Sequence, residues 1–136
     1  MRGVGTHSAF VCSLTRCVRA ECWADGVMSR LQPHGYAGVF VPKHQSPCPR
    51  FGYPADGVGI FYKPSKFTLV ATDPVAFLDA QGKPMNQRAA IAVLQSTSTS
   101  APYSLVLACC HLKAKRGFET MRVEQMEQLL RVRVCM

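Results

Sequence analysis

The sequence predicts an α/β fold in which short β-strands dominate and two helices flank them. Several short runs are rich in apolar and β-branched residues and are separated by Pro, Gly, Asp and Ser clusters, the pattern typical of strands and turns. Two other segments carry the residue spacing of helices. The chain has 136 residues, of which 48% are hydrophobic, so it is long enough for one domain with a buried core.

The predicted elements can be placed in chain order. A short helix is expected over 24–31, where Pro33 and Gly35 end it. Strands are then expected over 39–42, 58–62, 67–71, 89–94 and 104–110, with loops rich in Pro, Gly or Ser over 42–54, 80–84 and 96–102. A second helix is predicted over 118–132, with Glu119 in its first turn. We expect its stripe to pack against the core (Phe118, Met121, Gln125, Met126, Leu129 and Leu130).

The positive charge is unevenly distributed along the chain. The formal net charge is +8. Residues 30–66 carry five cations against Asp56 alone, and residues 111–136 carry six cations against three glutamates. If these two stretches meet in space, they form a basic surface that attracts polyanions such as RNA. The alternative is an ordinary solvated basic surface.

The cysteines and the apolar runs indicate the cellular setting. None of the seven cysteines shows the C-x2-C spacing of a zinc site, and an odd number favours a reduced, intracellular and most simply cytoplasmic location. The run Leu105–Cys110 is too short to span a membrane. Residues 1–20 form an atypical segment that need not be ordered. Their arginines, hydroxyl residues and lack of acids give a mitochondrial location as the alternative.

The junction between the last predicted strand and the second helix could bind phosphate. His111 ends the strand, and Lys113, Lys115 and Arg116 precede the expected helix start near Phe118. Unpaired backbone N–H groups and the helix dipole favour an anion at such a start. The alternative is a basic loop without a ligand. A nucleophilic dyad of His111 with its neighbour is disfavoured, because adjacent strand residues point to opposite faces.

Several segments resemble one protein family. The segment HLKAKRGFE from His111, followed by Arg122 and Gln125, resembles the His-Leu-Lys-Ala segment of the exonuclease-endonuclease-phosphatase superfamily, in the branch of the nocturnin and carbon catabolite repressor-type deadenylases. Further similar segments are Gly35-Tyr36, Val39–Lys43, Ser46-Pro47-Cys48, Asp56–Lys63 and Asn86–Ala92. The resemblance covers about residues 21–132, and the segments occur in the family's order.

The resemblance implies a fold and a set of site residues. The fold is an incomplete DNase-I-like sandwich of mixed β-sheet with flanking helices, formed by residues 21–136. In the implied Mg2+-dependent phosphoester hydrolysis, His111 is catalytic and Glu21 binds the metal. The other implied site residues are Lys43, Lys113 and Lys115 on substrate phosphate, Asp56 organising the pocket and Asn86 near the cleft. The alternative for Glu21 is a structural carboxylate at a helix start.

The resemblance also implies that catalytic groups are missing. The family's water-activating Asp-Asn segment and its terminal Asp-His segment would lie beyond residue 136. Because loss of an essential group costs on the order of 4 kcal/mol of transition-state stabilisation or more, we expect this chain alone to be inactive. We also expect one sheet to be left with an exposed inner face.

Three functions remain open at this point. The first is a 3′–5′ exoribonuclease that acts on poly(A). The second is a phosphatase that removes the 2′-phosphate of NADP(H). The third is a non-catalytic RNA-binding or regulatory fragment. In each case the expected partner is RNA or a phosphorylated nucleotide, and none involves a membrane.

Overall fold

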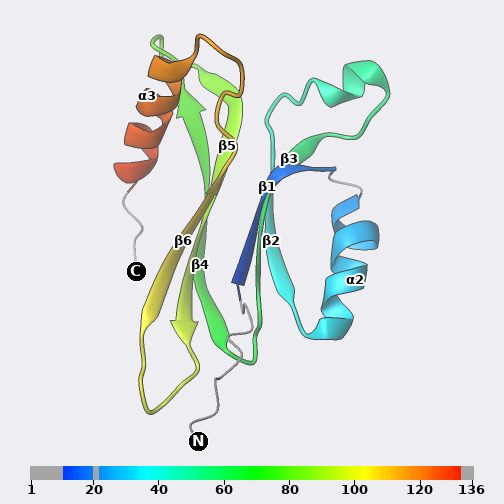
Figure 1. Cartoon of the computed structure of the whole chain (residues 1–136), viewed down its shortest axis with the longest axis vertical. Coiled ribbons are helices and arrows are strands. Elements are labelled where there is room, and N and C mark those ends of the chain that lie inside the picture. Colours follow the sequence, from blue (N-terminus) through cyan, green and yellow to red (C-terminus); the bar gives the residue numbers. More distant parts are fainter. Residues whose placement is uncertain (1–10, 20–21, 133–136) are drawn as a thin grey trace, which may run out of the picture.

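The chain folds into two three-stranded antiparallel sheets (Figure 1). The computed structural model describes residues 11–19 and 22–132. The first sheet has the order β1-β3-β2 and the second β4-β5-β6, and every pairing that the structure describes is antiparallel. The strands are β1 (Val11–Arg19), β2 (Ala37–Pro42), β3 (Asp56–Tyr62), β4 (Phe67–Leu78), β5 (Pro84–Ser96) and β6 (Ser104–Cys110). The helical segments are η1 (Trp23–Met28), α2 (Ser29–Leu31), η2 (Gln32–His34), η3 (Cys48–Phe51) and α3 (Glu119–Leu130).

The two sheets pack face to face and bury the central core. Side chains of the first sheet contact those of the second in one buried cluster of Val41, Val58, Ile60, Ala90, Ala92 and Cys109. The expectation of an exposed inner sheet face is therefore wrong. Both sheets form within this chain, and each covers the other's inner face.

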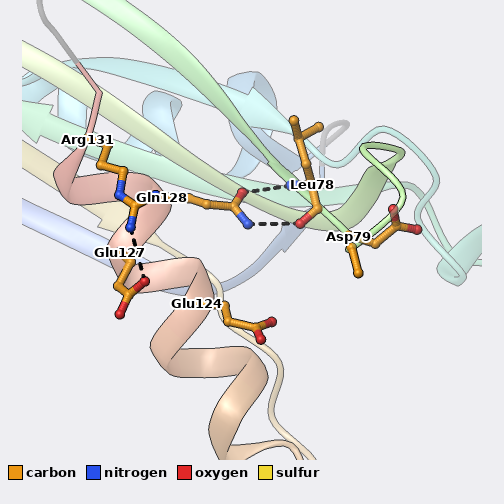
Figure 2. A pocket seen from close by; sticks show the side chains of 7 residues that line it. Leu78, Asp79, Glu124, Glu127, Gln128 and Arg131 are labelled. Carbon is orange, nitrogen blue, oxygen red and sulfur yellow. Dashed lines mark hydrogen bonds and ion pairs between the residues drawn. The ribbon is translucent and has the colours of Figure 1, made fainter.

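Helix α3 covers one end of the outer face of the second sheet (Figure 1). Leu129 packs into a second buried cluster with Val75, Phe77, Ala89 and Ile91. Gln128 fixes the helix to the edge strand β4. Its side-chain Oε1 accepts from Leu78 N at 2.8 Å, and its Nε2 donates to Leu78 O at 2.9 Å (Figure 2).

The predicted apolar stripe of α3 is only partly buried. Gln125 and Leu129 are buried as expected, but Leu130 is 80% exposed and Met126 is 38% exposed. The helix lies on the sheet along a narrow line, so residues next to that line in the helical projection still face solvent.

An aromatic stack covers the outer face of the first sheet. The Trp23 ring stacks on Phe40 at 5.0 Å and on Phe61 at 4.8 Å between ring centroids. Gly38 and Gly59 provide the space, because a Cβ atom on Gly59 would lie 2.5 Å from the Trp23 ring and one on Gly38 would lie 2.8 Å from it. The predicted helix over 24–31 is present and forms part of a longer helical stretch from η1 to η2.

Each predicted strand is present, but four of the five, β2 to β5, are longer than the sequence indicates. Strand β4 continues to Leu78 through Pro74, which pairs with Ala90. Proline is compatible with this position because β4 is an edge strand. Strand β1 occupies part of the segment that we treated as atypical, and it pairs with β3 with a register shift between Leu14 and Val18. No helix in the described part of the chain is long and apolar enough to cross a membrane.

The space under Trp23 leads to a first prediction. We expect Gly59→Ala to destabilise the fold by about 1–3 kcal/mol, because the added methyl group overpacks the stack. The measurement is urea unfolding followed by fluorescence of the single tryptophan. Gly26→Ala is the control, because its Cβ would meet only an ordinary contact of 3.4 Å. Equal unfolding midpoints for the two variants would contradict the prediction.

Candidate functional site

Polar side chains replace the apolar core at one end of the sandwich. In the first sheet, Val41 and Val58 face the second sheet, and Lys43 and Asp56 lie two residues further along their segments. In the second sheet, three polar residues continue the inner-face positions of the core residues of β5 and β6: Asn86, Arg88 and His111. Because alternate strand residues share a face, all five are directed to the space between the sheets. We call these five residues the inter-sheet cluster.

Asp56 organises one side of the inter-sheet cluster. The residue is 1% exposed. Its carboxylate accepts from the Lys43 ammonium, from the Ser46 hydroxyl at 2.5 Å and from the Cys48 thiol at 3.7 Å. Its backbone N–H donates to Ser46 Oγ at 3.3 Å, and its carbonyl accepts from Lys43 N at 2.8 Å. These bonds hold the loop after β2 against the start of β3.

Lys43 is paired with a carboxylate in this structure. Its side chain is only 9% exposed, and its ammonium forms the ion pair with Asp56. The resemblance implied that Lys43 contacts substrate phosphate. The structure places it beside His111 but balances its charge with that of Asp56.

His111 lies at the end of β6, where it meets both sheets. Its backbone N–H donates to Arg88 O at 2.9 Å, and its Nδ1 is buried without a hydrogen-bond partner. Burial lowers the pKa of His111, and the Lys43 charge lowers it further, while Asp56 opposes the shift. The imidazole is therefore predominantly neutral at pH 7. A neutral imidazole can donate one hydrogen bond and accept another.

Two further polar groups of the inter-sheet cluster lack partners. Asn86 Oδ1 and Arg88 Nε are buried without a hydrogen bond. The sequence singled out Asn86 but missed Arg88. The available signal was the alternation in β5, which puts Arg88 on the same face as Asn86 and Ala90.

The loop after His111 is fixed to helix α3. Arg122 donates to the carbonyl oxygens of Lys113 and Lys115, each at 3.0 Å, and Gln125 Oε1 accepts from Lys113 N at 3.1 Å. The Lys113 ammonium lies 4.8 Å from the Phe118 ring centroid. Lys115 is exposed. The two lysines thus lie on an ordered loop that leaves the inter-sheet cluster.

The start of α3 already holds a carboxylate. Glu119 accepts weakly from Gly117 N–H at 3.4 Å and forms an ion pair with Arg122 at 2.9 Å. The pKa of Glu119 is lowered, first by its own backbone N–H and then by Arg122. Glu119, paired with Arg122, therefore already interacts with this helix end, and the phosphate site expected there stays a prediction.

Cys110 and His111 face opposite sides of the second sheet. Cys110 packs against the cluster under α3, and burial raises the pKa of its thiol. A raised pKa makes the thiol a weak nucleophile. This arrangement agrees with the sequence argument against a thiol–imidazole dyad.

The described residues supply only part of a metal site. Glu21, the implied metal ligand, lies outside the described residues, and β1 ends at Arg19, opposite Asp56. Among the described residues, no group of three His, Cys, Asp or Glu side chains could hold a metal ion. Both oxygens of Asp56 contact neighbouring donors. Asn86 Oδ1 is the one buried side-chain oxygen of the described part that is left without a partner, and Mg2+ prefers such hard oxygen ligands.

Comparison with known proteins gives consistent relatives, although no family model matches the chain. Nocturnin from Drosophila melanogaster is 35% identical over 105 residues, which is 74% of this chain and 16% of the relative. Nocturnin from Xenopus laevis is 34% identical over 106 residues, which is 76% of this chain and 26% of the relative. The chain therefore spans about a quarter or less of these relatives' length.

Solved structures show the same fold. The human Nocturnin catalytic domain with a bound sulfate anion superposes with a TM-score of 0.74 at 28% identity, covering 89% of this chain and 43% of that one. ANGEL2, a 2′,3′-cyclic phosphatase in complex with adenosine-2′,3′-vanadate, superposes with a TM-score of 0.72 at 21% identity, covering 89% of this chain and 33% of that one. These superpositions confirm the DNase-I-like sandwich with flanking helices.

The fold and the sequence similarity together define the class of protein. The chain belongs to the exonuclease-endonuclease-phosphatase superfamily of phosphoesterases. Within this superfamily it falls in the nocturnin-type branch, of which it represents a part.

The ion pair leads to a stability prediction. We expect Asp56→Ala to destabilise the fold by about 3–5 kcal/mol, because it leaves the Lys43 charge buried and unpaired. The double variant Lys43→Met/Asp56→Leu should lose less, because both charges are removed together. Urea unfolding of both variants measures the difference. A double variant as unstable as the single one would contradict the prediction.

The environment of His111 leads to a pH prediction. Its pKa is lowered in the folded state, so the unfolded chain binds the proton more tightly. The neutral form of His111 therefore contributes to the free energy of unfolding at pH values above its pKa in the unfolded chain, which is about 6.5. This contribution is lost as the pH falls toward the lower pKa of the folded state.

NMR titration and unfolding measure this effect. The His111 imidazole should titrate with a midpoint below about 6.5. His111→Gln should reduce the fall in unfolding midpoint between pH 7.5 and 5.5, and the exposed His34→Gln is the matched control. An elevated midpoint for His111 would refute the prediction.

Proposed function

We propose that this chain forms one wall of a magnesium-dependent phosphoester hydrolase site that acts on ribonucleotide substrates, with the 3′ end of poly(A) RNA as the principal candidate. The observation that carries the proposal is the inter-sheet cluster. It puts a neutral imidazole, an unpartnered amide oxygen and cationic groups at one end of a sandwich of this superfamily.

Each residue of the wall has a proposed task. His111 donates a hydrogen bond to a phosphoryl oxygen, where negative charge develops during attack by water. Asp56 positions Lys43 and the loop after β2 through its hydrogen bonds. Lys113 and Lys115 contact the substrate's further phosphates from the loop after β6.

The proposed metal ligands are Glu21 and Asn86. A bound Mg2+ polarises phosphoryl oxygens and helps to generate the attacking nucleophile. Asn86 Oδ1 is the described ligand of this pair, because it is buried and has no other partner.

Anions bound to the structural neighbours support the class of substrate. The human Nocturnin catalytic domain was solved with sulfate and ANGEL2 with adenosine-2′,3′-vanadate, and both ligands are tetrahedral or phosphorane-like oxyanions. ANGEL2 shares the fold with this chain, so its ligand supports only the general class of phosphoryl chemistry in such a sandwich.

We further propose that the 136-residue chain binds its substrate without turning it over. Water activation needs a base close to the phosphate. In the described part of the chain, the one buried carboxylate is that of Asp56, and it is engaged by Lys43 and Ser46.

Binding and turnover can be measured separately. We expect fluorescein-labelled oligo(A) to bind with an affinity that falls as salt rises, and no AMP release in the presence of Mg2+. A parallel titration with NADPH tests the 2′-phosphatase alternative, which gains support if NADPH competes with oligo(A) at lower concentration. Absence of salt-dependent binding to either ligand would contradict the proposed function. AMP release that is abolished by His111→Ala would contradict only the proposed inactivity.

A further inference from the structure

The charges of the inter-sheet cluster do not balance on the described residues. Lys43 and Asp56 form a pair and cancel each other. His111 is held neutral at pH 7 by burial and by the nearby Lys43 charge. The remaining charged member is Arg88, which carries a guanidinium.

Arg88 has no counterion in the described structure. The ion pairs among the described residues are Lys43–Asp56, Arg122–Glu119 and Arg131–Glu127. Arg88 Nε is buried and makes no hydrogen bond. Arg88 as a whole is half-buried, but an N–H group that is buried without a partner is costly, and a bound ion is one way in which proteins complete such a group.

The position of Arg88 puts this charge on the inner face of the second sheet, within the inter-sheet cluster. Arg88 continues the inner-face alternation that includes Ala90 and Ala92. Its carbonyl accepts from His111 N, so the two residues are neighbours across β5 and β6. His111 Nδ1 and Asn86 Oδ1 are unpartnered in the same region, which makes three incomplete polar groups on one wall.

We propose that Arg88 binds a phosphoryl group of the substrate and makes the inter-sheet cluster selective for anions. The proposal rests on the proposed function and adds a specificity-determining residue to it. A guanidinium presents planar N–H donors that match two oxygens of one phosphate. Arg88 thereby supplies the uncompensated positive charge that Lys43, paired with Asp56, does not.

Inorganic phosphate is the probe that tests this assignment. The 136-residue chain is titrated with phosphate at pH 7.5 and constant ionic strength, and binding is followed by the imidazole NMR signal of His111. The His111→Gln variant assigns that signal. We expect a saturable shift in the unmodified chain.

Two substitutions at Arg88 separate the contribution of its positive charge to phosphate binding from that of its planar guanidinium. Arg88→Gln should weaken phosphate binding by about tenfold or more, since a charge-assisted hydrogen bond contributes on the order of 1.5–3 kcal/mol. Arg88→Lys should retain part of the affinity, because it keeps the charge and loses the planar fork. Arg30→Gln, an exposed residue of α2, removes the same charge elsewhere and should change the affinity less than about twofold.

Thermal unfolding without phosphate distinguishes a structural role of Arg88 from a role in phosphate binding. Removal of a half-buried charge that has no counterion among the described residues should leave the melting temperature of Arg88→Gln unchanged or raise it. A lower melting temperature combined with weaker binding would show that Arg88 holds the fold together, and would overturn the inference.

The remaining outcomes separate the inference from the proposed function. Equal phosphate affinities of Arg88→Gln and the unmodified chain would overturn the role of Arg88 and leave the proposed function standing. Absence of a saturable shift in the unmodified chain would overturn the inference, and the proposed function would fall only if oligo(A) and NADPH also failed to bind.

Discussion

The buried carboxylate of Asp56 is the interaction on which the site depends. It lies at the start of β3, where the inner face of the first sheet changes from apolar to polar residues, and it engages Lys43, Ser46 and Cys48 at once. A carboxylate with 1% exposure must be compensated by such donors to remain ionised. The same bonds hold the loop after β2 against the sheet. They therefore both compensate the charge of the Asp56 carboxylate and fix the position of the loop.

The close approach of the two sheets sets the position of the second wall. Small side chains on β5, Ala90 and Ala92, face Val58 and Ile60 across the core. His111 follows the same inner face by one alternation beyond Cys109, and its burial follows from this spacing. The loop beyond His111 then depends on α3, because Arg122 and Gln125 bind its backbone. Packing of the helix and placement of the loop lysines are therefore linked.

The local pattern of the sequence was sufficient for the elements but not for their partners. Alternation and turn residues located the strand at Ser104–Cys110 with the bounds that the structure has. They ended strand β4 too early, because Pro74 indicates the end of a strand unless that strand is known to lie at the edge of a sheet. In α3, Leu129 is buried and Leu130 is exposed, and this difference depends on the angle at which the helix packs on the sheet. A single sequence does not contain that angle.

The same limit explains which charges could be assigned from the sequence. Similarity to a family segment implied that Lys43 contacts substrate phosphate, but its ion pair with Asp56 joins the loop after β2 to the start of β3 and has no local signature. Arg88 was missed because it lies within β5, a strand whose other residues indicate a buried core position. The two kinds of charge act over different distances. Exposed cations of a chain with net charge +8 attract polyanions from afar and are screened beyond about 10 Å at 0.1 M salt, whereas a half-buried guanidinium acts at contact and is screened less. Long-range attraction and local selection can therefore be separated by salt, because only the first should fall steeply as ionic strength rises.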